Sequence, residues 1–122
     1  MALIRRKGDM KLTLTTMPIS TNKLYQGRRF LTKEGKANKE AISWEAKAQW
    51  MPRKPITGKI ATTARLYFKD GRMLDIENLK ALWDSLSGIV YEDDRQIHEL
   101  HIFKEIDKQR PRVEITISSL TT

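Results

Sequence analysis

The stretch from Ile56 to Phe68 most constrains the fold of this chain, because apolar and β-branched residues recur at every second position from Ile60 to Phe68. Alternation of this kind predicts a long strand, since successive side chains of a strand point to opposite faces. One face of this strand would carry Ile60, Thr62, Ala64, Leu66 and Phe68. The two prolines of "MPRKP" precede the strand and "KDGR" follows it as a turn. The chain must therefore build a sheet around this strand.

Two segments with helical periodicity flank the strand. Thr32 is the expected N-cap of a helix that extends to about Trp50, with Glu34 favourably placed in its first turn. The inner stripe of this helix is predicted to be Ala37, Ala41, Trp44 and Ala48. The second helix should begin near Ile76 and end near Gly88. Its predicted buried stripe is Leu79, Leu82, Trp83 and Leu86.

Three further segments, residues 10–17, 96–106 and 112–118, have the pattern of strands, and residues 18–30 have the composition of a loop. The resulting β-α-β-α-β-β order predicts a mixed α/β (α+β) fold with two helices packed on a mixed sheet. A length of 122 residues is that of one compact domain with one core. We therefore expect a single domain over residues 1–122.

Composition excludes several classes of protein. The chain has no cysteine, which rules out disulfides, thiolate metal sites and cysteine nucleophiles. No apolar run approaches the roughly 20 residues that a membrane-spanning helix requires. The first residues, "MALIRRKGDM", lack the apolar stretch of a secretion signal. These features predict a cytoplasmic protein without a membrane partner.

The charge of the chain is divided unevenly. Residues 1–69 contain 16 lysines and arginines but four acids, whereas residues 70–122 contain seven bases and eleven acids. A basic surface beside an acidic cluster suits a polyanion partner with a cation site next to it. A basic protein without such a partner is the alternative interpretation, and charge alone does not decide between the two.

Carboxylates are concentrated in two short stretches, "LDIEN" and "YEDDRQI". Asp75 precedes the second helix, and Glu77, Lys80 and Asp84 form one line on its polar side. The sheet could bring Asp93 and Asp94 back beside the helix start. Converging carboxylates repel one another, and a hard divalent cation such as Mg²⁺ would remove that conflict. The alternative is structural: a cap at Asp75, an ion pair between Lys80 and Asp84, and an ordinary acidic loop.

Three motifs in register resemble the RusA family of four-way DNA junction resolvases. The first is Pro-x-Ser-x-Asn-x-x-Tyr, matched by Pro18, Ser20, Asn22 and Tyr25. The second is an acidic run leading to a lysine and Asp-x-Leu, matched by Asp75, Glu77, Asn78, Lys80, Asp84 and Leu86. The third is a glycine followed by Asp-Asp-x-Gln, matched by Gly88, Asp93, Asp94 and Gln96. The similarity extends from about Leu12 to Ile117.

This resemblance implies a magnesium-dependent crossover junction endodeoxyribonuclease with no organic cofactor, bacterial or bacteriophage-encoded, that acts as a homodimer in DNA recombination and repair. It implies that Asp75, Glu77 and Asp94 bind Mg²⁺, with Asp93 assisting, and that Lys80 contacts the scissile phosphate. Two departures stand out: Glu77 replaces the usual aspartate, and one residue instead of two separates Asn78 from Lys80. The alternative function is a branched-DNA-binding protein of the same fold with lost or weak cleavage. A basic interaction module without catalysis is a further alternative.

The DNA-binding surface is predicted in the basic first half of the chain, where lysine and arginine can contact phosphates. Tyr25 could stack on an unpaired base, although a role in anchoring the loop is also open. The candidate DNA-binding residues are Asn22, Lys23, Tyr25, Arg28, Arg29, Lys33 and Lys36.

Overall fold

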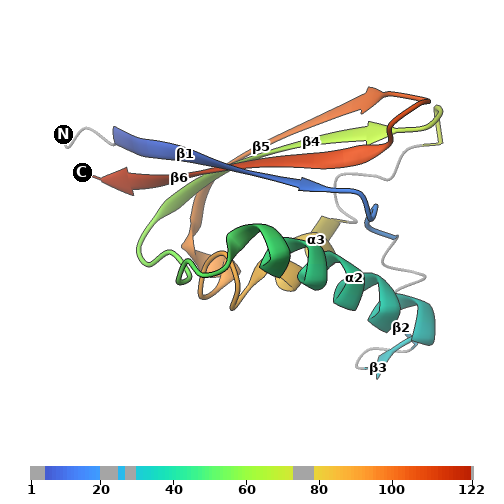
Figure 1. The fold of residues 1–122 in the computed structure, drawn as a ribbon, viewed down its shortest axis with the longest axis horizontal. Helices are drawn as coiled ribbons and strands as arrows, with labels where there is room; N and C mark the ends of the chain where they lie inside the picture. The colour runs from blue at the N-terminus through green and yellow to red at the C-terminus, as the bar shows by residue number, and fades with distance from the viewer. Residues whose placement is uncertain (1–4, 20–24, 27–29, 73–78, 122) are drawn as a thin grey trace.

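The computed structural model describes residues 5–19, 25–26, 30–72 and 79–121, with side chains from 10–19, 31–72 and 79–120. Its centre is a four-stranded mixed sheet in the order β1-β6-β4-β5. The strands are β1 (Arg5–Leu14), β4 (Ile60–Phe68), β5 (Ile97–Ile106) and β6 (Arg112–Thr121). β6 pairs antiparallel with both β1 and β4, whereas β5 pairs parallel with β4. Both helices lie on one side of this sheet (Figure 1).

The core lies between the sheet and these helices, and alternation determines which side chains enter it. Every second residue of β4 from Ile60 to Phe68 is buried, as the alternating pattern predicts. β6 contributes Val113, Ile115 and Ile117 to the same core. The mixed α/β fold with two helices on a mixed sheet is therefore confirmed.

The long helix α2 (Lys33–Trp50) begins where the sequence predicts. The Thr32 hydroxyl accepts a hydrogen bond from the Gly35 N–H at 2.9 Å, and Glu34 lies in the first turn. The shorter helix α3 (Lys80–Leu86) buries the predicted stripe of Leu79, Leu82, Trp83 and Leu86. The Ser43 hydroxyl donates to the carbonyl oxygen of Ser85 at 2.9 Å, which ties α2 to α3.

The predicted inner stripe of α2 is wrong. The buried residues of this helix are Gly35, Ile42, Ala46 and Trp50. Trp44 is 73% exposed, so the stripe predicted to face the core faces solvent instead. Both sides of α2 carry a tryptophan and small residues, and the side with Ile42 packs against the sheet.

Other differences concern the ends of elements. The long central strand begins at Ile60 rather than Ile56, which forms only an isolated bridge with Tyr91. Within the segment predicted as loop, a small two-stranded sheet forms from β2 (Tyr25–Gln26) and β3 (Phe30–Leu31). A one-turn 3₁₀ helix, η2 (Asp94–Gln96), precedes β5. None of the described helices is both long enough and apolar enough to cross a membrane.

The end of β1 is fastened to α2 by the Glu45 carboxylate. It accepts hydrogen bonds from the Thr15 and Thr16 backbone N–H groups at 2.8 and 2.9 Å, and from the Thr15 hydroxyl. Burial alone would raise the pKa of Glu45, but these hydrogen bonds outweigh it and lower the pKa below its ordinary value. The ionised carboxylate therefore stabilises the fold.

Replacing Glu45 with glutamine should lower the free energy of unfolding by about 1 kcal/mol at neutral pH, because a charged acceptor of several hydrogen bonds is lost. A carboxyl with a depressed folded pKa stabilises the protein above its unfolded pKa, and this contribution disappears as pH falls through the folded pKa. Urea unfolding of both proteins at neutral pH and at about pH 3 should therefore show a difference that shrinks in acid. An equal difference at both pH values would contradict this role of the charge.

Candidate functional site

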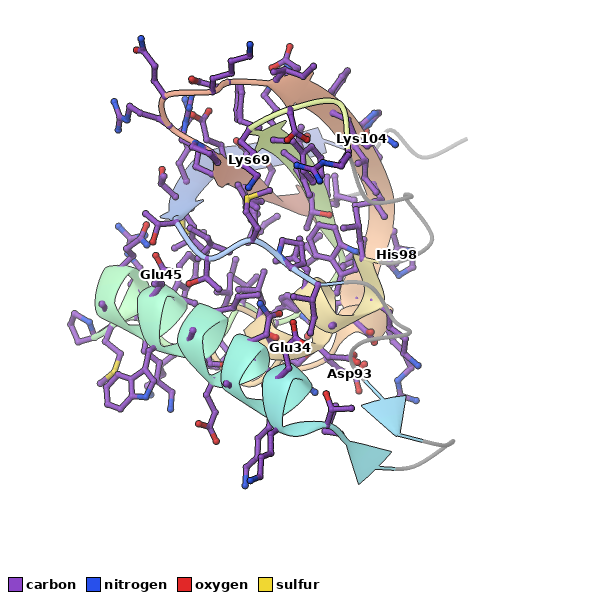
Figure 2. All side chains as sticks on the ribbon, turned by 90° about the vertical axis from the view of Figure 1, so that its right-hand side faces the viewer. Glu34, Glu45, Lys69, Asp93, His98 and Lys104 are labelled. Atoms are coloured by element: carbon purple, nitrogen blue, oxygen red, sulfur yellow. The ribbon has the colours of Figure 1, made fainter. Side chains whose placement is uncertain are left out.

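The candidate site is built on the connection between β4 and β5, which contains α3 and a short acidic turn. Parallel neighbouring strands require such a crossover, and here a helix supplies it. Asp84 lies on α3, and Asp93 and Asp94 lie in the turn that leads into β5. Figure 2 shows Asp93 on the helix side of the sheet. The connection therefore places acids from two segments on the same side.

The acidic turn has a defined structure. The Asp93 carboxylate accepts a hydrogen bond from the Arg95 backbone N–H at 2.9 Å, while the Asp93 N–H donates to the Gln96 side-chain oxygen at 2.8 Å. The Gln96 amide nitrogen also donates to the carbonyl oxygens of Ile56 and Gly58, at 2.8 and 2.9 Å. Gln96 thereby anchors the turn to the segment before β4. Gln96, the glutamine of the third motif, therefore has a structural role.

Three carboxyl groups interact in this region. Burial raises the pKa of Asp94, and hydrogen bonding and like charge from Asp93 and Asp84 raise it further. The Arg95 backbone N–H and guanidinium lower the pKa of Asp93. Of the two neighbouring acids, Asp94 therefore keeps a proton more readily than Asp93. This is the behaviour expected where carboxylates crowd together.

Tyr91 positions the two acidic segments relative to each other. Its side chain is fully buried, and its hydroxyl donates to the Trp83 carbonyl oxygen at 2.7 Å. Trp83 directly precedes Asp84, and Tyr91 lies three residues before Asp94. Burial, then the charge of Asp94, raises the pKa of this phenol, so the hydroxyl remains a donor. The ring and its hydrogen bond hold α3 beside the acidic turn.

Asp84 is the acid whose place in the cluster the sequence did not reveal. The helical line of Glu77, Lys80 and Asp84 was a usable signal, because it put Asp84 on the polar face of α3. From the sequence alone, Asp84 was interpreted as the ion-pair partner of Lys80, and nothing connected it with the acidic turn. The structure brings Asp84 to Asp94 instead.

The other predicted residues are placed only in part. Lys80 is the exposed first residue of α3, and Lys33 and Lys36 are exposed at the start of α2. The backbone of Tyr25 lies in β2. The remaining predicted positions, Asp75, Glu77, Asn22, Lys23, Arg28 and Arg29, lie outside the described residues.

The donor set suits a hard cation such as Mg²⁺, which takes carboxylate oxygens as ligands. The pKa of Asp94 is raised by burial and by the neighbouring carboxylates of Asp93 and Asp84, and a cation bound there would relieve the repulsion among these acids. Among the described residues, no group of three or more acidic, histidine or cysteine side chains is arranged to hold a metal ion. The predicted set of Asp75, Glu77 and Asp94 therefore remains a prediction.

The crossover of this mixed sheet carries carboxylates from two segments in a chain with a formal net charge of +8, a combination that suits a polyanion substrate with a cation beside it. The family model described as Endodeoxyribonuclease RusA matches residues 15–118. Because this match covers most of the chain, the protein belongs to the RusA endodeoxyribonuclease family. No individual curated protein sequence matches the chain.

Proposed function

We propose that this protein is a magnesium-dependent endonuclease that resolves four-way (Holliday) DNA junctions by paired nicks during recombination and repair. The placement of Asp84 on α3 and of Asp93 and Asp94 in the turn that the Tyr91–Trp83 hydrogen bond ties to α3 is the structural observation that supports this proposal most directly. Membership of an endodeoxyribonuclease family supports DNA as the substrate. The protein would act as a homodimer in the cytoplasm of a bacterium or a phage-infected cell.

The metal site would be formed by Asp75, Glu77 and Asp94. Bound magnesium would supply a Lewis acid that activates water and offsets negative charge on the phosphodiester. Asp93 would hold the turn in shape through its contacts with Arg95 and Gln96, and would assist Asp94, the next residue, in binding the metal. Asp84 would set the local negative potential beside Asp94.

Lys80 would act on the substrate rather than on the metal. It lies one helical turn before Asp84 on the exposed side of α3, so its ammonium group can approach a phosphate near the acids. A positive charge there stabilises the charge that develops on the phosphate during attack. The exposed Lys33 and Lys36 would contribute phosphate contacts that position the DNA.

Two active sites are required for the paired reaction. A four-way junction has approximate two-fold symmetry, and a dimer with two-fold symmetry presents one site to each of two opposed strands. Homodimerisation is therefore part of the proposed function.

The test is a nicking assay on a synthetic four-way junction labelled on each strand in turn. We expect nicks on two opposed strands with Mg²⁺, none with EDTA, and little cleavage of a linear duplex of the same sequence. Tight junction binding without product over a range of Mg²⁺ and Mn²⁺ would favour a branched-DNA-binding protein that has lost cleavage. Equal binding to branched and linear DNA, without cleavage, would favour a basic interaction module.

A further inference from the structure

Helix α2 has a second apolar face on the side away from the core. It consists of Ala37, Ala41, Trp44, Ala48 and Met51, which we call the outer stripe. Trp44 and Met51 are 73% and 66% exposed. At 100° per residue this stripe lies opposite the buried Gly35, Ile42 and Ala46. Because α2 forms the outer layer of the molecule, the stripe faces away from the sheet (Figures 1 and 2).

The spacing of the outer stripe is the one used by paired helices. Its members are separated by four, three, four and three residues, which is the alternation of the core positions in a heptad repeat. A single exposed apolar residue needs no explanation. Five apolar residues on one line of a helix do need an explanation. The three alanines among them would let another helix approach closely around Trp44.

We propose that the outer stripe is the homodimer interface, in which α2 packs antiparallel against α2 of a second copy about a two-fold axis. This inference rests on the proposed function, because paired nicking requires two copies. It identifies the surface that joins them and the orientation in which they meet.

Charge favours the antiparallel orientation. The exposed Glu40 and Lys47 lie on the same flank of the outer stripe. In an antiparallel pair, like flanks face each other, so Glu40 meets the partner's Lys47 and Lys47 meets the partner's Glu40. The Lys47 ammonium nitrogen already lies 6.0 Å from the Trp44 ring centre, at the edge of the stripe. Both ion pairs would therefore border the central tryptophans.

A parallel pair would be disfavoured by the same residues. There each flank faces the opposite flank of the partner, which places Glu40 near the partner's Glu45. Glu45 is already committed to Thr15 and Thr16 and keeps its negative charge. The interface would then contain two such pairs of carboxylates, and their negative charges would repel each other.

The extent of the stripe sets the expected strength of the dimer. Fourteen residue steps separate Ala37 from Met51, which corresponds to about 21 Å of helix. A typical stable interface buries about 800 Å² on each partner, and a single pair of helices of this length covers less. We therefore expect a dimer that dissociates in the micromolar range.

Sedimentation velocity over a range of protein concentrations, without DNA or metal, tests this proposal. The wild type should dimerise, and Trp44→Glu should be monomeric at every concentration with unchanged circular dichroism, because Trp44 supports no core packing. The matched control is Phe103→Glu on β5, which replaces another exposed aromatic residue, 43% accessible and stacked on Arg65. This control should dimerise like the wild type.

A charge exchange tests the orientation. Glu40→Lys and Lys47→Glu should each weaken the dimer by about ten-fold, since each change turns two attractions into repulsions. The double variant E40K/K47E should recover the wild-type dissociation constant, and Lys108→Glu, in the turn before β6, should leave it unchanged.

A monomeric wild type, a Trp44→Glu variant that still dimerises, or dissociation caused by Phe103→Glu would each overturn the proposal. A double variant weaker than both single variants would overturn the antiparallel arrangement. These outcomes are independent of nicking, so failure of the interface and failure of the nuclease function can be told apart.

Discussion

Replacing Asp94 with asparagine is expected to reduce Mg²⁺-dependent junction nicking by at least about 100-fold while junction binding persists. Burial, and then the neighbouring carboxyl groups of Asp93 and Asp84, raise the pKa of the Asp94 carboxyl. Asparagine has nearly the same shape but cannot supply the negative oxygen that a hard cation requires. The measurement is single-turnover nicking in Mg²⁺, together with junction binding in EDTA by gel shift.

The matched control is Glu92→Gln, which neutralises an exposed carboxylate two residues away. It should change nicking by less than about three-fold, because exposed charges are largely screened. Asp94→Asn should also melt at no lower temperature than the wild type in EDTA, since it relieves repulsion among the acids. Nicking by Asp94→Asn within a few-fold of the wild type would remove Asp94 from the site.

Replacing Tyr91 with alanine is expected to lower the free energy of unfolding by about 3–5 kcal/mol, the usual effect of truncating a buried aromatic side chain. The ring is fully enclosed by the core, between α3 and the start of the acidic turn. The cavity left behind would also loosen the contact that positions Asp84 beside Asp94. Urea unfolding followed by tryptophan fluorescence measures the effect.

Tyr91→Phe separates packing from hydrogen bonding. It keeps the ring and removes only the 2.7 Å hydrogen bond to the Trp83 carbonyl oxygen, so it should lower the free energy of unfolding by about 1 kcal/mol. The loss is modest because that oxygen also accepts hydrogen bonds from the Ser87 N–H and hydroxyl, each at 3.2 Å. If the phenylalanine and alanine variants were equally unstable, the contribution of Tyr91 to the free energy of unfolding would come from its hydroxyl and not from its ring.

Where hydrophobic contrast is strong, the sequence predicts the fold well. β4 carries Ile60, Leu66 and Phe68 on its buried side, α3 carries three large apolar residues, Leu82, Trp83 and Leu86, on its own, and both buried stripes were correctly identified. α2 lacks this contrast, since Trp44 and Trp50 lie on different sides and alanines occur on both. Periodicity identified the helix and its N-cap but could not decide which side faces the sheet.

The site was predictable in its chemistry more than in its geometry. The acidic pair Asp93 and Asp94 stood out from the sequence, and so did the polar line through Asp84. Their meeting depends on contacts between distant segments: Tyr91 with Trp83, and Gln96 with the segment before β4. No local pattern encodes such contacts, and the family resemblance named the acids without giving the contacts between them.

The segment from Met51 to Lys59 is attached at both ends, and it would connect the proposed dimer interface to the proposed metal site. It leaves α2 at the last residue of the outer stripe, and its carbonyl oxygens at Ile56 and Gly58 accept the Gln96 amide. Gln96 in turn receives the Asp93 N–H. Packing of α2 against the second subunit would thus make residues 51–59 more rigid. The acidic turn that Gln96 attaches to this segment would then be held more firmly in the dimer than in a monomer.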